Sequence, residues 1–450
     1  MIRWVLALTL CLVCSAGVVG AVCINELMSS NQTTLQDEDG NWPDWIELYN
    51  PDDRTVDLAG CGLTDDEKKP FKWIFPAAAL PPQGFLLIYA SDKNRHEVGR
   101  PLHTNFKIKS SSEVICLTAF DGQTLDRVTA PAPAPDMSWG RLPDGGDAWD
   151  FFVKPTPNGS NNGGQVGRTT LPPQFSAPAG FYRRPMMLSL DTPQAAARIF
   201  YTTDGSLPDS TKLLYSEPLQ LDSTTVIRAC TFRSGGDPGD IVSQTFFIDE
   251  QTSLPVVSLI TDPMNLWVDD YGIYTKGKSY QPDFPYKGAN FWREWERPVF
   301  LQFFEQDGSP ALSADAGMRI FGHWSVGAPF KPLVLYARKK YGSGKFRAQL
   351  FPDLSIREFE AFILRNSGND WHRTLFRDAL VHSLAAEIGL PTQAYRPVLV
   401  FLNGQYWGIH NLRERMNEHY LASHFGVRAD ALDLIAMNYG FQVYAGDSLN

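Results

Sequence analysis

Cysteine is scarce in this sequence, and the number and spacing of the cysteines argue against a disulfide framework and against a zinc site. Only 6 of the 450 residues are cysteine, and two of them, Cys11 and Cys14, fall in the apolar N-terminal segment. Four cysteines remain over the rest of the chain, and none of them has CxxC spacing: Cys23, Cys61, Cys116 and Cys230. Four cysteines are too few for a disulfide framework in a chain of this length. Without CxxC spacing, a zinc site is not expected either. Cys61 and Cys116 either pair or are buried thiols, and the apolar context favours buried thiols.

Positive charge is also in short supply. The chain has 40 Lys and Arg against 50 Asp and Glu, which gives a net charge of -10, and no basic patch stands out. Nucleic-acid binding draws most of its affinity from neutralising phosphates, so a nucleic-acid partner is not expected. The 8 histidines show neither HExxH nor any other ligand spacing, and we predict no metal-binding residue.

Long apolar runs are confined to the N-terminus. Arg3 precedes an apolar run over residues 4–13, and small residues then lead to Ala21. This layout predicts a secretory signal peptide over residues 1–21. A retained membrane anchor is the alternative, because residues 4–23 are nearly long enough to span a bilayer. With the signal removed, no membrane span is expected, and we predict a secreted or cell-envelope protein of bacterial type.

Residues 22–157 read as short strands between turn residues, with predicted strands at 44–49, 72–75, 84–90, 113–119 and 124–129. Strands at this spacing predict a β-sandwich. The strings INELMSSNQTTLQDEDGNWPDWIELYN, DLAGCGLTDD, HTNFKIKSSSEVICL and SWGRLPDG resemble the lamin-tail domain. That resemblance implies an immunoglobulin-like sandwich.

A second sandwich is predicted beyond a linker. Residues 158–170 begin with NGSNNGGQVG, a composition typical of a flexible linker. Strand alternation returns over 171–249, where RIFYTTDGSLPDSTKLLYSEPLQLDSTTVIRACTF is similar to the C-terminal sandwich module of chitobiase-type glycosidases. Tyr201, Tyr215 and Phe232 could stack on sugar rings of a polysaccharide, but core packing is the favoured interpretation.

Residues 254–450 have a mixed α+β pattern. Two apolar strands, 318–321 and 332–337, are separated by a loop with glycines, and Lys331 stands at the entry to the second strand. A helix is predicted over 371–388 from the helical spacing of its apolar residues, with Asn369 or Asp370 as its cap. Asn403-Gly404 predicts a hairpin turn, and a shorter helix is expected at about 414–425 with Gly426 at its end. An unusually aromatic stretch, 266–295, contains a long loop that could cover a cleft or hold a partner.

The strings FKPLVLYARKKYG, LRNSGNDW, FRDAL and FLNGQYWGIHNLRER resemble the CotH (spore-coat protein H) family of atypical secreted protein kinases. The resemblance implies the N-terminal part of a kinase-like domain that uses ATP and Mg²⁺. It implies that Lys331 binds phosphate, with Arg319 as a second phosphate or carboxylate partner and Glu414 as an ion-pair partner of one of them. The catalytic aspartates of that family are expected C-terminal to the matched region, so the catalytic residues stay unknown, and Arg377 with Asp378 is interpreted as structural.

The predicted fold class is therefore multidomain, with two all-β immunoglobulin-like sandwiches followed by an α+β partial kinase-like domain. The implied function is ATP-dependent phosphorylation of Ser or Thr on an envelope or secreted protein, with little turnover expected from the chain as written. The alternative is a non-catalytic surface adhesion or scaffold protein, or one that attaches to carbohydrate through its middle sandwich. Metal-binding aspartates of a large lobe encoded beyond residue 450 would favour the enzyme, and a missing pair would favour the scaffold.

Overall fold

The computed structural model describes residues 22–437 and 441–446, so the predicted signal peptide with Cys11 and Cys14 lies outside the described residues. The chain divides into two compact units. The first unit runs to Leu171 and includes the short loops 193–197 and 233–238. The second unit holds the rest of the middle sandwich and the C-terminal region.

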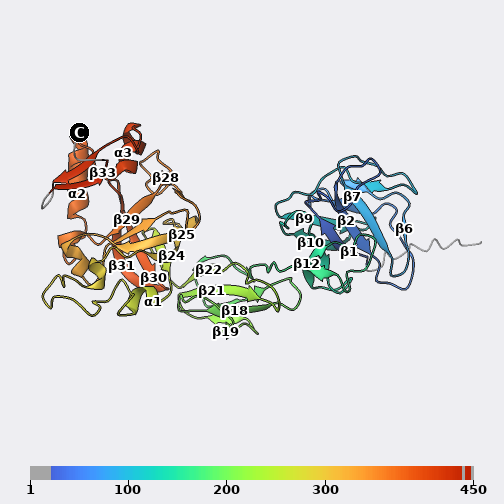
Figure 1. Ribbon diagram of the computed structural model, residues 1–450, viewed down its shortest axis with the longest axis horizontal. Coiled ribbons are helices and arrows are strands. Elements are labelled where there is room, and N and C mark those ends of the chain that lie inside the picture. Colours follow the sequence, from blue (N-terminus) through green and yellow to red (C-terminus); the bar gives the residue numbers. More distant parts are fainter. Residues whose placement is uncertain (1–21, 438–440, 447–450) are drawn as a thin grey trace, which may run out of the picture. The chain divides into compact units, whose positions relative to one another are not determined.

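The first unit is built on two antiparallel-rich sheets (Figure 1). One sheet has seven strands in the order β13 (Gln165–Val166), β12 (Trp149–Lys154), β11 (Ser138–Arg141), β1 (Cys23–Met28), β2 (Asp44–Tyr49), β7 (Phe85–Ala90) and β8 (Leu102–His103). The other has four strands in the order β10 (Thr124–Ala130), β9 (Glu113–Thr118), β4 (Gly62–Thr64) and β5 (Trp73–Ile74). A small pair joins β3 (Val56–Asp57) to β6 (Ala79–Leu80).

The core of this unit comes from side chains that alternate along each strand. Ile24, Leu27, Ile46 and Leu48 are fully buried in it, as period-2 strands with one covered face require. Trp139 stacks on Trp149 with ring centroids 5.8 Å apart. Cys61 and Cys116, with the other described cysteines, are free buried thiols, so of the two alternatives the buried thiols are confirmed.

On the face of the seven-stranded sheet away from this core, two buried glutamates lie directly opposite each other. Glu26 of β1 pairs in register with Glu47 of β2, and both are 0% exposed. Glu26 accepts hydrogen bonds from the hydroxyl of Ser138 and from the hydroxyl and backbone N–H of Thr156. Glu47 accepts one from the backbone N–H of Asn158. No Lys or Arg among the described residues pairs with either carboxyl group, so the pair is not neutralised by a cation of the chain.

Residues 158–170 differ from the flexible linker that their composition predicts. Asn161 is fully buried and donates to the backbone oxygens of Asn25 and Arg141, and β13 extends the seven-stranded sheet. Glycines predict a linker only when nothing anchors them, and here the contact of Asn158 with Glu47 and the hydrogen bonds of Asn161 bind the segment to the sheet. The segment is therefore part of the first unit.

The middle sandwich has a five-stranded sheet and two short strand pairs. The sheet order is β15 (Gly180–Tyr182), β22 (Val242–Ile248), β21 (Thr225–Phe232), β18 (Arg198–Thr202) and β19 (Leu213–Leu214). The pairs are β14 (Gln174–Phe175) with β17 (Leu190–Asp191), and β16 (Met186–Leu188) with β20 (Leu219–Leu221). Tyr201 and Tyr215 pack against the core of this sandwich, so core packing is confirmed for these two rings, whereas the half-buried Phe232 lies edge-on to Phe200 outside that core cluster.

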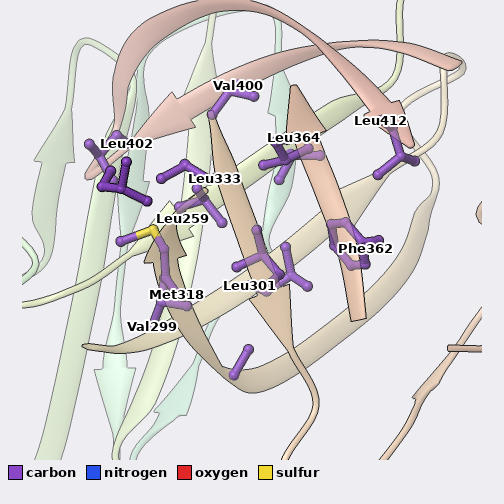
Figure 2. Close-up of a cluster of buried hydrophobic side chains, with 14 of the residues drawn as sticks. Leu259, Val299, Leu301, Met318, Leu333, Phe362, Leu364, Val400, Leu402 and Leu412 are labelled. Carbon is purple, nitrogen blue, oxygen red and sulfur yellow. The ribbon is translucent and has the colours of Figure 1, made fainter. Parts of the chain in front are cut away.

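The C-terminal region is built on a closed seven-stranded barrel. Its order is β23 (Val256–Ile260), β24 (Arg297–Phe304), β25 (Pro310–Ile320), β26 (Leu333–Tyr336), β29 (Ala361–Arg365), β31 (Gln405–Glu414) and β30 (Tyr395–Leu402). The barrel closes where β23 runs parallel to β30, and β27 (Phe346–Arg347) with β28 (Glu358–Phe359) forms a side pair. Alternate residues of each strand point inward, which fills the interior with Leu259, Leu301, Met318, Leu333, Phe362, Leu364, Val400 and Leu402 (Figure 2).

Outward-facing side chains of the barrel pack on the middle sandwich, and both belong to the second unit. Phe247 of β22 lies between Phe304 of β24 and Phe401 of β30, with ring centroids 5.6 Å and 5.0 Å away, and stacks on Phe181 at 4.4 Å. The hydroxyls of Thr245 and Ser258 are 2.7 Å apart beside these rings. Two parts that resemble different families thus share one aromatic core.

Three helices accompany the barrel: α1 (Met264–Trp267), α2 (Arg377–Glu387) and α3 (Glu418–Phe425), with a terminal hairpin of β32 (Leu434–Met437) and β33 (Phe441–Ala445). The helix predicted over 371–388 begins only at Arg377, because Leu375 has a positive φ of 64° and the Asp370 carboxylate binds the N–H groups of Thr374 and Arg377. Its expected apolar stripe does not pack: Leu380, Leu384 and Ile388 are 49%, 55% and 75% exposed.

The second predicted helix also starts later than expected. Glu414 ends strand β31 opposite Phe362, and Asn417 caps α3 by accepting from the backbone N–H of Tyr420 at 3.1 Å. Gly426 ends α3 with a φ of 71°, as predicted. In the described part of the chain, every helix is too short or too polar to cross a membrane.

Candidate functional site: an aromatic cavity with two lysines

A cavity of about 270 Å³ lies beside the start of β26. Its lining is aromatic and cationic, with no acidic side chain: Trp267, Tyr274, Lys276, Tyr286, Phe291, Gly327, Ala328, Pro329, Lys331 and Trp407. These residues come from the aromatic stretch 266–295, from the loop before β26, and from β31. We call this space the aromatic cavity.

Lys331 is buried at one side of the aromatic cavity. Only 5% of the residue is exposed, and its ammonium donates to the backbone oxygens of Val326 at 2.7 Å and Ala328 at 3.2 Å. The ammonium also lies 3.7 Å from the centroid of the Phe291 ring. Burial and, secondarily, the positive charge of Lys276 lower the pKa of Lys331 to about 8. Its hydrogen-bonding capacity is therefore largely used inside the protein.

Lys276 is the second cation of the aromatic cavity. Its ammonium lies 3.7 Å from the centroid of the Tyr286 ring and 5.2 Å from that of Tyr280, within the range of cation–π attraction. Among the described residues no carboxylate forms an ion pair with it. Sequence analysis did not single out this lysine. The dense aromatic residues around it did predict a loop over a cleft.

The side chain of Asn290 holds the chain around Lys276 in place. Asn290 is 4% exposed and donates to the backbone oxygens of Asp269 at 2.6 Å and Gly272 at 3.0 Å and to the hydroxyl of Thr275 at 3.0 Å. Gly277 follows with a φ of +69°, and a Cβ atom there would lie 2.3 Å from Oδ1 of Asn290. Glycine is therefore required directly after Lys276.

Three rings form the opposite wall. Trp267, Tyr274 and Trp407 contact one another with ring centroids 5.3 to 5.9 Å apart. The indole N–H of Trp407 donates to the hydroxyl of Tyr274 at 3.2 Å, and burial raises the pKa of Tyr274 well above its usual value. Trp267 is 48% exposed, so part of its face is open to a ligand.

The loop 322–330 closes one edge of the aromatic cavity. Asn366, which directly follows β29 and is 2% exposed, donates to the backbone oxygens of Ser325 at 3.3 Å and Phe330 at 2.7 Å. Its own Oδ1 accepts from the N–H of Gly368. Asn366 of the RNSGND string thus holds the loop 322–330 from one side, while the Lys331 ammonium binds two of the loop's carbonyl groups.

We expect replacement of Asn366 by alanine to loosen this loop. Two partly buried hydrogen bonds to loop carbonyl groups would be lost, which costs about 1 kcal/mol of local stability. Hydrogen exchange measured by mass spectrometry should show faster exchange over residues 322–330. Asn369→Ala, at an exposed asparagine of the same string, is the matched control and should leave that exchange unchanged.

The structure does not bring together the three residues predicted to bind a cofactor. Arg319 points away from the barrel interior, 3.2 Å from a carboxylate oxygen of Glu294. Glu414 accepts from the backbone N–H of Ala394 at 2.9 Å and from a ring nitrogen of His424 at 2.7 Å. The expected ion pair of Glu414 with Lys331 or Arg319 is not formed, because Arg319 pairs with Glu294, Glu414 pairs with His424, and Lys331 binds backbone oxygens. Of the three, Lys331 alone lines the aromatic cavity.

Charged residues around the start of α2 pair with one another. Asp378 lies 3.2 Å from the buried guanidinium of Arg413 and 3.4 Å from that of Arg365, and Asp370 lies 3.4 Å from Arg377. Arg377 and Asp378 are thus structural ion-pair residues, as interpreted from the sequence, although they begin the helix rather than lying within it. This network joins β29, β31 and α2 behind the loop 322–330.

Acidic residues suited to Mg²⁺ are not grouped in the described ranges. Over residues 22–437 and 441–446, no cluster of three or more His, Cys, Asp or Glu side chains could hold a metal ion. Asp430 pairs with Arg428 at 2.8 Å. The described residues therefore do not fit a magnesium ion, and no chemistry through that ion is derived from them.

Comparison with known protein families gives a separate match for each part of the chain. Residues 16–132 match the lamin tail domain, residues 177–243 the chitobiase/beta-hexosaminidase C-terminal domain, and residues 318–448 the CotH kinase protein family. A search of curated proteins found no match to the chain. The three resemblances indicated by the sequence are confirmed in kind and order, and so is the succession of two β-sandwiches and an α+β region.

Proposed function

We propose that the CotH-like region binds ATP in the aromatic cavity and acts in phosphoryl transfer to Ser or Thr of an envelope or secreted protein. The observation that carries the proposal is the lining of this cavity, in which open aromatic faces stand beside two cations without any acidic side chain. Aromatic faces stack on nucleobases, and lysines neutralise phosphate oxygens. Export of the chain is part of the same proposal, through the predicted signal peptide.

Different residues of the aromatic cavity suit different parts of a nucleotide. Trp267 and Trp407 offer ring faces to the base, while Lys276 and Lys331 make the cavity electropositive, which suits phosphates. A nucleotide would bring Mg²⁺ with it, and the ion would offset part of the phosphate charge. Since the described residues do not supply its ligands, the part played by this region is nucleotide binding and orientation.

We expect ATP binding to depend on Trp267. Isothermal titration calorimetry of the full chain with ATP, with and without Mg²⁺, should give binding that Trp267→Ala weakens about 5- to 100-fold, the effect of one lost base–aromatic stack. Trp324→Ala is the matched control, because Trp324 is equally exposed but does not line the cavity. Absence of ATP binding at millimolar concentration, or equal loss in both variants, would contradict the proposal.

A second candidate is a non-catalytic binding platform for carbohydrate. The half-exposed rings of Trp267, Trp324 and Phe330 around the aromatic cavity favour it, since such faces also stack on sugars. In that case the chain should be retained on insoluble chitin or cellulose and should not respond to ATP. Carbohydrate attachment through the middle sandwich finds less support, because two of the three rings predicted to stack there pack on its core.

A further inference from the structure

The two lysines of the aromatic cavity are in different states. Lys331 is buried, and its ammonium is bound by the carbonyl oxygens of Val326 and Ala328. Lys276 is exposed, lies over the Tyr286 ring, and forms no ion pair with a carboxylate of the described residues. An anion that enters the cavity meets a satisfied donor in one lysine and an available donor in the other.

Rigid surroundings place Lys276 at this point. The next residue, Gly277, lies against Asn290, and the backbone oxygen of Lys276 accepts from the N–H of Asn290 at 3.3 Å. The Lys276 ammonium lies over the Tyr286 ring, 3.7 Å from its centroid. An ammonium held this way loses little conformational freedom when it binds an anion.

The surroundings of Lys331 suit a structural role. Its two acceptors both belong to the loop 322–330, which Asn366 holds from the other side. Moving the ammonium to an external anion would leave two loop carbonyls without this donor. Lys331 therefore closes the loop on the barrel.

We infer that Lys276 is the residue of the aromatic cavity that binds the anionic group of the ligand, a polyphosphate or a similar multiply charged anion, and that Lys331 is a positioning residue that fastens the loop 322–330. The inference deepens the proposed nucleotide function, and it assigns the phosphate contact to a lysine other than the one implied by the CotH resemblance. The inference concerns only the anionic group of the ligand, so it can be tested with a ligand that has no nucleobase.

The test uses inorganic tripolyphosphate and ATP as separate probes of the full chain. Lys276→Met should weaken tripolyphosphate binding about tenfold, the effect of one lost charged hydrogen bond, and should leave hydrogen exchange of residues 322–330 unchanged. Lys331→Met should instead speed that exchange and alter tripolyphosphate affinity by less than about threefold. Lys278→Met is the matched control, because Lys278 lies in the same segment but pairs with Asp270 and does not line the cavity.

Each outcome separates the inference from the proposed function. Tripolyphosphate binding that depends on Lys276, without any ATP binding, supports the inference and overturns the nucleotide proposal. ATP binding that Lys276→Met and Lys278→Met leave equally strong supports the nucleotide proposal and overturns the inference. No binding of tripolyphosphate, or faster loop exchange in Lys276→Met than in Lys331→Met, also overturns the inference.

Discussion

Replacing Glu47 by glutamine is expected to stabilise the first unit on the order of 3 kcal/mol at pH 8. Burial, with the charge of Glu26 opposite, raises the pKa of Glu47 from 4.5 to about 9. Between these values the unfolded chain carries an ionised glutamate and the folded chain a protonated one. Folding therefore takes up a proton, and stability falls as the pH rises from about 4.5 to about 9, by at most about 1.4 kcal/mol per pH unit. Glutamine removes this proton uptake and can still accept from the N–H of Asn158.

Differential scanning calorimetry of the full chain between pH 5 and 9 would measure the effect. One transition of the wild-type chain should move to lower temperature as the pH rises, and in Glu47→Gln that transition should be higher and less dependent on pH, although Glu26 and Asp44 keep raised pKa values. Glu26→Gln is the contrasting variant. Glutamine has one acceptor oxygen where Glu26 has two, so at least one of the three donors would face an amide N–H₂ group, and we expect a loss of about 1–3 kcal/mol. Equal pH dependence in wild type and Glu47→Gln would show that Glu47 is ionised in the fold.

Replacing Phe362 by alanine is expected to lower the free energy of unfolding of the second unit by about 3–5 kcal/mol. Phe362 is 0% exposed in the middle of β29, and its ring centroid is 5.1 Å from that of Phe346 (Figure 2). Its backbone pairs with Leu335 of β26 and Glu414 of β31. The cavity left by alanine would lie inside a closed barrel, whose strands cannot collapse into it without breaking their ladder.

Urea unfolding followed by tryptophan fluorescence would measure this loss. Phe362→Leu keeps most of the volume and should cost about 1 kcal/mol. Because β26 and β29 carry Lys331 and Asn366 at their ends, Phe362→Ala should also speed hydrogen exchange in the loop 322–330. A change below about 1 kcal/mol in the alanine variant would mean that the barrel interior relaxes freely.

Strands were predicted well where alternation and turn residues agree. The predicted strand 44–49 coincides with β2, and the predicted strands 84–90 and 113–119 lie within one residue of β7 and β9. The hairpin at Asn403-Gly404 is formed with positive φ at both residues, as its type requires. What alternation could not supply is strand order: closure of the barrel depends on the parallel contact of β23 with β30, which lie about 140 residues apart in the chain.

The helix at 371–388 was predicted too long because a regular apolar spacing does not report backbone conformation. Asp370 was considered as a cap for a helix starting beside it, but its carboxylate instead stabilises an irregular turn that ends at Arg377. For residues 158–170 the prediction was wrong in the opposite sense, because it assigned too little order to the segment. Its composition is that of a linker, and only its tertiary contacts order it: Asn158 binds Glu47, and Asn161 binds the backbone of Asn25 and Arg141.

The candidate site was predicted in part. Lys331 and the aromatic loop were both singled out, and the structure places them around one cavity. Arg319 and Glu414 were associated with Lys331 by family resemblance, whereas in the structure each of them pairs with a different side chain. Lys276 was missed because a lone lysine in an aromatic loop has no signature in sequence; its importance follows from the absence of acidic side chains in the lining of the cavity.

The aromatic core shared by Phe247, Phe304 and Phe401 bears on how this chain could have arisen. The middle sandwich resembles a module that recombination can move between genes, but here β22, which lies next to the edge strand β15, supplies a ring that covers the barrel wall. Once such a ring is buried, neither part can be exchanged without leaving phenylalanine side chains of the other in water. Exchange of one part alone is therefore expected to destabilise the other.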